Sequence, residues 1–347
     1  MTDAPLAIRG IGVHGGFGCG ADALSRAVRG PGTPNDTMEV ASADGPVRLP
    51  VYTADLAPLA QYVPKKALRR VNRFSKLALL GACAALEDAG LSTPEDREGI
   101  GIVIASGYGA SKSTFDFLDS MIEEDGTCPS PTVFANSVHC SAASNLSILL
   151  GIRGPCLTVS QFELSPVSGL LSAREWLRTG RVKAVLFGAV DELCAVLGYS
   201  YDRFFHGSSD GPMRPLDLEC QTAVPGEGAA FMVLASEGGD AGHGWLDGIA
   251  WENCGPTLVP GGMHCVLGAE GHACHAPHYR AVLGGVDSGV SAYSPAFGSF
   301  PSGQVFDILA ATLDAEHEGF ETACCVKSDS EGNCGVVKWR APGASTV

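Results

Sequence analysis

The sequence predicts a layered α/β fold built from two lobes or two similar halves. Short apolar segments alternate along the chain with segments of helical periodicity, and this alternation is typical of a sheet covered by helices. The 347 residues exceed one ordinary domain, and 45% hydrophobic with 18% charged residues suit a large buried core. The 45 glycines indicate many tight turns between short elements.

The first part of the chain supplies most of the predicted elements. β-Branched residues in segment 6–13 predict a buried strand. In segment 66–91, apolar residues from Val71 to Ala85 recur every three or four positions, which predicts a helix that ends at Gly90. By the same criteria we expect strands at 100–106, 155–160, 183–191 and 229–235, and helices at 142–151 and 166–179.

The later part repeats this style more loosely. We expect strands at 245–250, 321–327 and 334–339, and a helix at 303–314. Segments 36–62 and 252–285 have weak periodicity, which predicts loops or surface insertions.

Charge and composition exclude several classes of function. The formal net charge of −15 argues against nucleic acid and anionic membranes, because both require clustered basic residues. No signal peptide and no apolar run of membrane-spanning length is visible, so we expect a cytoplasmic protein. The 13 cysteines are scattered and form no CxxC pair, so we expect buried thiols rather than disulfides.

Five segments in the same order resemble the β-ketoacyl synthase family. They cover a first strand and turn, a long early helix, a strand with a nucleophile turn and buried helix, and the strand that closes the first half. One of them, VFANSVHCSAASNLSILLGIRGP, resembles most specifically the chain length factors, a degenerate branch of that family. The segments are 8–20, 69–91, 133–155, 154–192 and 214–236.

The resemblance implies a thiolase-like fold, layered αβαβα with two similar halves. It covers residues 6–236 well and is thinner afterwards, so we expect the second half to be shortened. The expected division is a ketosynthase-like half at 1–236, with dimerisation and tunnel elements, and a trimmed half at 237–347.

The catalytic residues that the resemblance implies are missing. Family members use a cysteine thiolate at a helix N-terminus and two histidines. At the cysteine position this chain has Glu163, and the family's second histidine corresponds to Ser299, with Ser294 at a preceding lysine position. The His-Gly-Thr-Gly-Thr run that carries the first histidine is absent. The turn at 328–335 keeps glycines but loses the family's aromatic gate.

Three interpretations of Glu163 stay open. A carboxylate attacks thioesters poorly but is favourable near a helix N-terminus, so it can fill the vacated site structurally. It can also assist the partner's site or decarboxylation. A register slip would place Gln161 there instead, and Ser165 is a weaker candidate nucleophile without a GxSxG elbow.

Other candidate sites are weaker. Segment 264–278 concentrates histidine and cysteine, but its spacing matches no structural zinc motif, so we expect a polar surface loop and no metal. The Gly107-Tyr108-Gly109 sequence lacks the remaining features of a dinucleotide site, and no cofactor is expected. We interpret His139 as a structural residue.

The helix after residue 110 carries the most specific functional suggestion. Ser111, Thr114, Leu118 and Met121 share one helical face. In chain length factors the equivalent helix lies at the dimer interface and walls the acyl tunnel, so small residues here favour a deeper tunnel; core packing is the alternative. Phe115 and Phe134 are further candidates for the wall.

These observations predict a chain length factor without activity of its own. It would form a heterodimer with an active ketosynthase through the strand at Cys156, Thr158 and Ser160, and work with an acyl carrier protein. The small tunnel residues favour a polyene or another reduced linear polyketide. Two alternatives stay open: a malonyl-decarboxylating or acyl-transferring ketosynthase relative, and a homodimeric scaffold subunit.

Overall fold

The computed structural model describes residues 4–42, 45–123, 130–205, 212–236 and 241–345. Ten strands form one continuous sheet, to which the short β2 (Gly18–Cys19) adds at β1. The first half of the sheet contains β1 (Leu6–Gly15), β5 (Ile100–Ala105), β6 (Cys156–Val159), β7 (Ala184–Asp191) and β8 (Gly228–Ser236). The second half contains β9 (Trp245–Asn253), β10 (His264–Leu267), β11 (Val290–Ser291), β12 (Thr322–Ser328) and β13 (Asn333–Arg340).

The two halves have the same topology. Their strands are ordered β6-β5-β7-β8-β1 and β11-β10-β12-β13-β9, so each half places its own strands in the order third, second, fourth, fifth, first. In each half three neighbouring strands are parallel and the last two pairings are antiparallel. The halves meet where β1 pairs with β9. This confirms the predicted fold of two similar halves.

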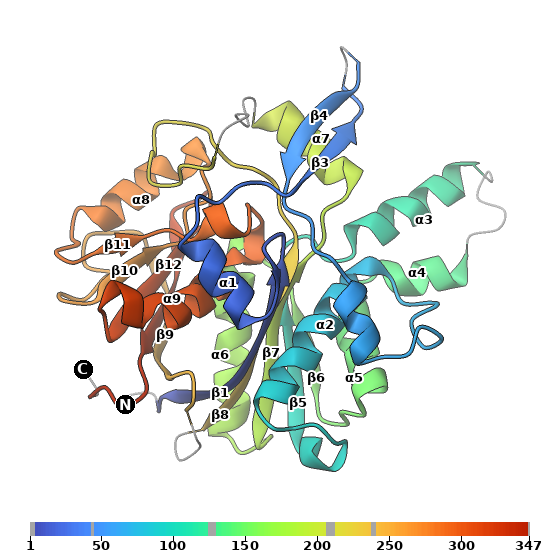
Figure 1. Cartoon of the computed structure of the whole chain (residues 1–347), viewed down its shortest axis with the longest axis horizontal. Coiled ribbons are helices and arrows are strands. Elements are labelled where there is room, and N and C mark those ends of the chain that lie inside the picture. Colours follow the sequence, from blue (N-terminus) through green and yellow to red (C-terminus); the bar gives the residue numbers. More distant parts are fainter. Residues whose placement is uncertain (1–3, 43–44, 124–129, 206–211, 237–240, 346–347) are drawn as a thin grey trace.

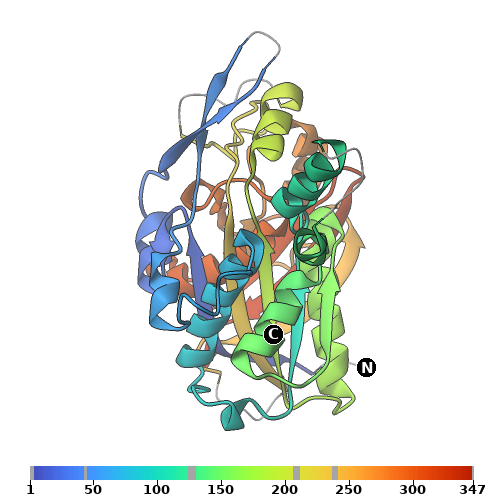
Figure 2. The same ribbon diagram turned by 90° about the vertical axis from the view of Figure 1, so that its right-hand side faces the viewer.

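Helices complete the five layers (Figure 1). α6 (Ser165–Arg178) and α9 (Gln304–Glu318) lie between the halves, since each contacts strands of both. α2 (Arg73–Asp88) and α5 (Ser141–Leu150) cover the outer face of the first half, and α8 (Ala276–Leu283) covers that of the second. The turned view in Figure 2 shows the same layers. α1 (Ala21–Val28) packs against α9.

Side chains of β5 show how one strand serves two layers. Ile102 and Ile104 point to the outer cluster under α2, whereas Val103 and Ala105 point to the central cluster around α6. A strand alternates its side chains between faces, so a strand that is buried on both faces is apolar throughout. This explains why the sequence of this strand shows no polar positions.

Several predicted boundaries need correction. Helix α2 begins at Arg73 rather than at residue 66, because the Asn72 side chain caps it by accepting the Ser75 amide at 2.9 Å. Segment 36–62 is not a simple loop: it forms the hairpin β3 (Asp36–Val40) and β4 (Val47–Val51), which packs against α7 (Ala195–Phe204). The predicted division between residues 236 and 237 falls at an undescribed segment, 237–240, and stays a prediction.

The segment 252–285 is also more ordered than predicted. It contains β10, which pairs with β11 and β12, and helix α8, which packs on them. These elements are short, and a four-residue strand leaves little periodicity in a sequence. The expected shortening of the second half stays a prediction.

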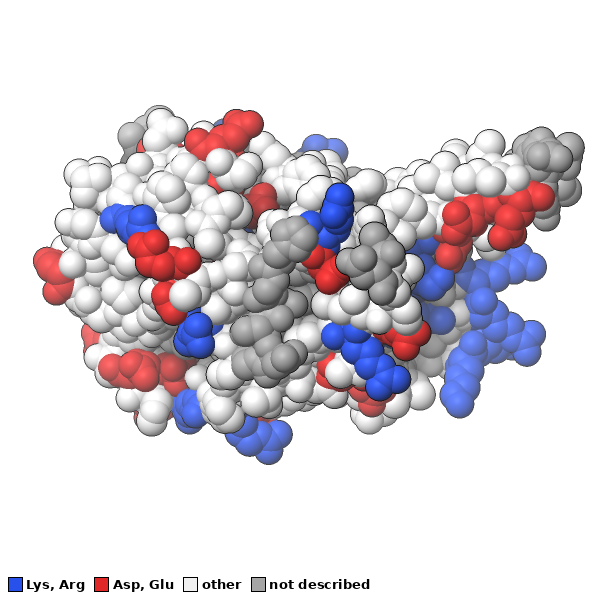
Figure 3. All heavy atoms as spheres, turned by 90° about the horizontal axis from the view of Figure 1, so that it is seen from above, with Lys and Arg blue, Asp and Glu red and all other residues white. Residues whose placement is uncertain are grey.

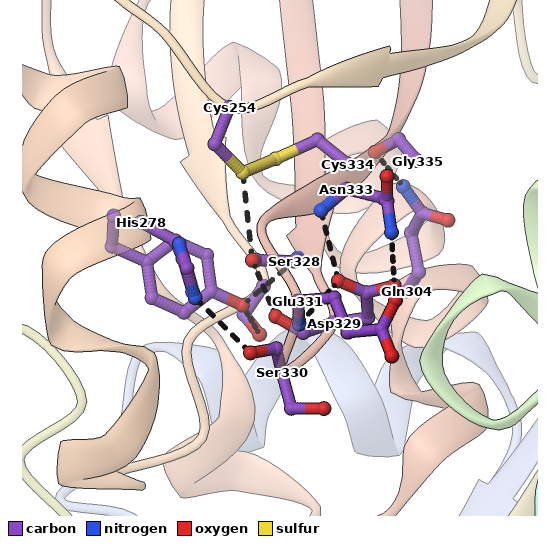
Figure 4. Close-up of a disulfide and its surroundings, with 12 residues drawn as sticks. Cys254, His278, Gln304, Ser328, Asp329, Ser330, Glu331, Asn333, Cys334 and Gly335 are labelled. Carbon is purple, nitrogen blue, oxygen red and sulfur yellow. Dashed lines mark hydrogen bonds between the residues drawn. A yellow bond between two sulfur atoms is a disulfide. The ribbon is translucent and has the colours of Figure 1, made fainter.

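The expectation of free thiols is wrong at one place. Cys254, which follows β9, and Cys334, which lies in β13, form a disulfide with a Cα–Cα distance of 5.5 Å (Figure 4). Beside it, the Asp329 carboxylate accepts hydrogen bonds from the Glu331 and Asn333 amides and holds the intervening turn. The spacing of the cysteines gives no sign of this pairing, because it depends on the register of two neighbouring strands.

Two helices project from the body. α3 (Ser111–Glu123) and α4 (Pro131–Ser137) pack on each other and extend sideways beyond the sheet (Figure 1); we call them the α3–α4 arm. The rings of Phe117 and Phe134 lie 5.3 Å apart between the two helices. Within the described part of the chain, no single helix is long and apolar enough to cross a membrane, although α4 and α5, bent by 100°, pass such a test together.

Candidate functional site

The candidate site lies where strands β5, β6 and β7 end, next to the beginning of α6 and α9. Asp191, at the end of β7, is fully buried and accepts the amide hydrogens of Gly107 at 3.0 Å, Tyr108 at 2.8 Å and Ser302 at 3.0 Å. One carboxyl group therefore ties together the loop after β5 and the turn before α9. This arrangement fixes the backbone positions of the loop and the turn that carry the other residues of the site.

A tight turn between β6 and α6 presents Glu163. Phe162 just before it has a φ of 45°, the only positive φ of a non-glycine residue in the described ranges. Such a conformation is strained for a side chain and is often found at functional turns. Ser165 stabilises the turn: its buried hydroxyl accepts the Gln161 amide at 2.7 Å and lies 3.0 Å from the Ser106 carbonyl. Ser165 is thus engaged by the backbone.

Glu163 lines a small cavity of about 70 Å³. The other lining residues come from the loops after β5 and β10, from α7 and from the turn before α9: Tyr108, Tyr201, Phe205, Glu270, His272, Cys274, His275 and Pro301. Glu163 is half-buried and makes no hydrogen bond to any residue the structure describes. Gln161 instead accepts the Ser168 hydroxyl at 2.8 Å, so its side chain is held against α6.

Hydrogen bonds fix the tautomer of His272. The Gln221 carbonyl oxygen accepts the Ala273 amide at 3.0 Å, so the Gln221 NH₂ group faces His272 Nδ1 at 3.2 Å and donates to it. His272 Nε2 therefore carries the proton and donates to the Ser299 hydroxyl at 2.8 Å. Burial lowers the pKa of His272 to about 3, so the ring is neutral at physiological pH.

The network continues into the core beyond Ser299. The Ser299 hydroxyl donates to Glu270 at 3.2 Å, and Glu270 forms an ion pair with the buried Lys327. The Tyr201 hydroxyl lies 2.9 Å from the same Ser299 oxygen. Burial raises the pKa of Asp307, which lies close to Lys327, to about 8. Because Asp307 is thus mainly protonated at neutral pH, the positive charge of Lys327 is balanced by Glu270 and is not available to a ligand.

The groups that line this cavity differ from those used in thioester exchange. Thioester exchange needs a thiolate and a base to activate it. Burial raises the pKa of Cys274, the one cysteine that lines the cavity, so it is a protonated thiol. Both nitrogens of His272 are occupied by hydrogen bonds, and its Nε2 is a donor. The residues that line the cavity thus include the Glu163 carboxylate and a protonated thiol, Cys274.

The structure brings together two predicted positions and adds residues that the sequence did not single out. Glu163 lines the cavity, and Ser299 lies one hydrogen bond away from His272 in its wall. The His-Gly-Thr-Gly-Thr run is absent as noted, and a different histidine, His272, lines the cavity. It was missed because it lies in a segment predicted to be a loop.

The residues predicted to wall a tunnel lie on the α3–α4 arm. The Ser111 hydroxyl donates to the Tyr108 carbonyl, and the Thr114 hydroxyl bonds to the Ser137 carbonyl of α4 at 3.0 Å. Phe115 is half-buried, whereas Leu118 and Phe134 are 45% and 55% exposed. A wall made by these residues would need another chain to close it.

The predicted interface residues lie on the edge of the sheet. Cys156 and Ser160 are exposed and Thr158 is half-buried. Among the strands that the structure describes, β6 pairs only with β5, so its other edge carries free backbone groups. Free edges of this kind are potential pairing sites for a further strand.

The histidines of segment 264–278 are directed to different surroundings. His264 stacks on Phe320 with ring centroids 4.2 Å apart, whereas His272 belongs to the cavity. His278 lies near the Ser330 carbonyl in the disulfide region (Figure 4). Nowhere in the described ranges do three or more histidine, cysteine or acidic side chains gather as a metal site would require. His139 borders Gly109, where its ring blocks any larger side chain.

A five-layered fold with two like halves, and a strained turn that leads into the buried helix, define a thiolase-like protein. Residues 27–238 match the model of the β-ketoacyl synthase N-terminal domain. The chain therefore belongs to the β-ketoacyl synthase family.

Comparisons with individual proteins support the family and the fold. The 3-oxoacyl-[acyl-carrier-protein] synthase 2 of Vibrio cholerae is 28% identical over 181 residues, which is 50% of this chain and 44% of that protein. The chain spans about half the length of the curated relatives it matches. A type II polyketide synthase ketosynthase in complex with its acyl carrier protein has a TM-score of 0.76 at 17% identity, covering 99% of this chain and 100% of that one. The ishigamide ketosynthase/chain length factor has a TM-score of 0.74 at 16% identity, covering 98% and 100%.

Proposed function

We propose that this chain is a non-catalytic chain length factor. It pairs with an active ketosynthase and shapes the tunnel that holds the growing polyketide, so that the tunnel depth sets the chain length. The observation that carries this proposal is the cavity at Glu163, which holds a carboxylate in place of a thiolate and a histidine that cannot act as a base. A protein with this site contributes shape to a condensation reaction but no nucleophile.

The exposed apolar surface around β6 supports a protein partner. Ile148 on α5 is 77% exposed, Phe162 at the turn after β6 is 62% exposed, and Ile122 on the arm is 76% exposed. Large apolar side chains beside a free sheet edge are typical of an interface rather than of solvent-facing surface. A second chain that paired here would also cover Leu118 and Phe134 and complete the tunnel wall.

The charge at the site argues against the decarboxylase alternative. The name of the Vibrio cholerae relative is that of an active synthase, which favours a catalytic role. However, a malonyl thioester carries a carboxylate, and this carboxylate would lie beside Glu163 and Glu270 in a poorly solvated cavity. Like charges that share one small cavity repel strongly where water is excluded. Lys327, which could offset this repulsion, is paired with Glu270.

A basic segment supports an acidic or phosphorylated partner such as an acyl carrier protein. Lys65, Lys66, Arg69 and Arg70 are exposed in the segment that precedes α2, in a chain whose formal net charge is −15. Figure 3 shows lysine and arginine side chains gathered at the end of the molecule that bears the α3–α4 arm. A local positive patch steers anionic groups, such as a phosphopantetheine phosphate, toward the site it borders.

Co-expression with a catalytic ketosynthase tests the proposal. We expect the two chains to co-purify one to one, and Phe134→Asp or Ile148→Asp to abolish the complex, because each would bury an unpaired charge. Trp251→Asp is the control, because Trp251 is also exposed, at 47%, but lies on β9 in the other half. A stable homodimer that ignores the ketosynthase would instead favour the scaffold alternative and contradict the proposal.

A further inference from the structure

Glu192 joins the α3–α4 arm to the body of the protein. It follows β7 directly and is 1% exposed. Its carboxylate accepts the Lys112 amide at 3.0 Å, in the first turn of α3, and the Phe74 amide in the first turn of α2 also acts to lower its pKa. One side chain thus faces backbone donors of two helices, of which one belongs to the body and the other to the arm.

Further polar contacts surround this junction. The Asn72 side chain, which caps α2, donates to the Ser113 hydroxyl of α3 at 3.1 Å and to the Asn136 carbonyl of α4 at 2.9 Å. In the described part of the arm, Met121 and Ile122 at the outer end of α3 are exposed. Hydrogen bonds at the base of the arm therefore contribute to its position.

Among the residues that the structure describes, Glu192 forms no ion pair. Arg73 acts on its charge but forms two hydrogen bonds with Glu227, and the Lys112 ammonium pairs with Asp116 on the surface at 2.7 Å. The Cys194 thiol also faces this group, and burial raises its pKa. Burial raises the pKa of Glu192 to about 7, and the nearby Glu227 adds to the effect.

We propose that Glu192 is a positioning residue that ties the base of the α3–α4 arm to α2 when its carboxyl group is ionised and releases one of the two helices when it is protonated. An ionised carboxylate accepts hydrogen bonds at both oxygens, whereas the protonated group has one hydroxyl that donates. In the proposed function, on which this last step rests, the arm walls the tunnel. The state of Glu192 then affects product length without contact with the growing chain.

The charged state is unfavourable for overall stability. The folded pKa of Glu192, about 7, lies above its ordinary value of 4.5, so the folded state binds more protons than the unfolded state between these two values. Stability from this group is therefore greatest at low pH and is lost as the pH rises through the window toward about 7. The ionised Glu192 thus lowers the stability of the fold at the junction where its carboxylate faces two helices.

Hydrogen exchange of the purified chain, alone or in its complex, tests the inference. After correction for intrinsic rates, we expect the first amides of α3 to exchange at least about tenfold faster at about pH 6 than at about pH 8. Glu192→Gln should show the fast exchange at both pH values, because an amide cannot accept at both ends. Asp116→Asn removes an exposed carboxylate from the same helix and should keep the pH dependence.

Two further readouts separate this role from simple packing. Glu192→Gln should raise Tm at about pH 8 while it loosens the arm, whereas loss of an ordinary packing residue lowers Tm. Exchange that is equal at both pH values, or a variant with lower Tm and unchanged exchange, would overturn the inference. In the complex, product length should depend on pH in the wild type and not in Glu192→Gln. An arm whose exchange depends on pH, together with a constant product length, would contradict the tunnel role but not the positioning role of Glu192.

Discussion

Ser299 links His272 to Glu270 in the polar network of the site. The Nε2 proton of His272 goes to Ser299, the Ser299 proton goes to Glu270, and the charge of Glu270 is met by Lys327. Each donor in this hydrogen-bond network has an acceptor inside the protein, so the network offers a substrate neither a base nor a free cation. At the scale of single residues, the site is stabilised as a structural core.

Substitution of Ser299 tests this interpretation. Ser299→Ala would leave His272 Nε2 and a Glu270 oxygen without partners in a buried site, and we expect the free energy of unfolding to fall by about 2–3 kcal/mol. Denaturant unfolding measures this as a lower midpoint at constant slope. Ser172→Ala, which removes a hydroxyl bonded within α6, should change stability by less than about 0.5 kcal/mol. Equal effects of the two changes would argue against the network.

The sequence allowed some of these residues to be predicted and not others. Glu163 could be placed because it lies in a continuous segment, from strand through turn to helix, whose pattern is strong. His272 could not, because it lies in a stretch of short elements without periodicity, and its importance depends on Gln221, which is distant in the sequence. The hydrogen bonds that decide its tautomer exist only in the folded chain.

At the scale of elements, the α3–α4 arm and the edge strand β6 carry the proposed function. The helix after residue 110 and the strand at 155–160 were predicted from the sequence, whereas helix α4 was not. The hairpin of β3 and β4, the strand β10 and helix α8 were not predicted, because their stability comes from packing on neighbours rather than from their own patterns.

A bulky residue on the arm should shorten the product. Thr114 lies on the face between α3 and α4, where Phe would fill space along the proposed tunnel. For the complex of Thr114→Phe with its ketosynthase, we expect products shorter by at least one extension unit, measured by mass spectrometry. Asp119→Phe places the same ring at an exposed position of α3 and should leave the length unchanged. An unchanged length for Thr114→Phe would contradict the assignment of the tunnel.

Charge reversal in the basic segment should weaken carrier protein binding. The double change Lys65→Glu and Lys66→Glu removes two exposed positive charges beside α2, and we expect the affinity for the acyl carrier protein to fall at least about tenfold at low salt. The difference should shrink as salt screens the charges. Titration calorimetry at two salt concentrations measures both effects. Equal affinity of the double variant and the wild type would exclude this segment as the docking site.

At the scale of the whole molecule, repetition of one topology explains the architecture. The two halves share a strand order, and α6 and α9 fill the space between them. The alternation of strands and helices allowed the layered fold to be predicted. The continuity of the sheet through β1 and β9 could not be predicted, because the pairing of two distant edges leaves no local pattern.

The disulfide adds a constraint across the second half. It closes a loop between residues that are 80 positions apart, and a cross-link of this length stabilises a fold by about 2–4 kcal/mol. We expect peptide mapping of the oxidised protein to recover Cys254 linked to Cys334, and Cys254→Ser to lower Tm. Cys19→Ser, at an exposed free cysteine, is the control and should have no effect. Recovery of both residues as free thiols under oxidising conditions would contradict the pairing.

In the proposed pair, the ketosynthase partner carries out the condensation. The most direct measurement is elongation of an acyl carrier thioester with malonyl carrier protein, followed by mass spectrometry, for this chain alone and with its ketosynthase. We expect no elongated product from the chain alone and a defined product from the pair, since Glu163 and the closed network of His272 supply no nucleophile. An elongated product formed by the isolated chain would contradict it.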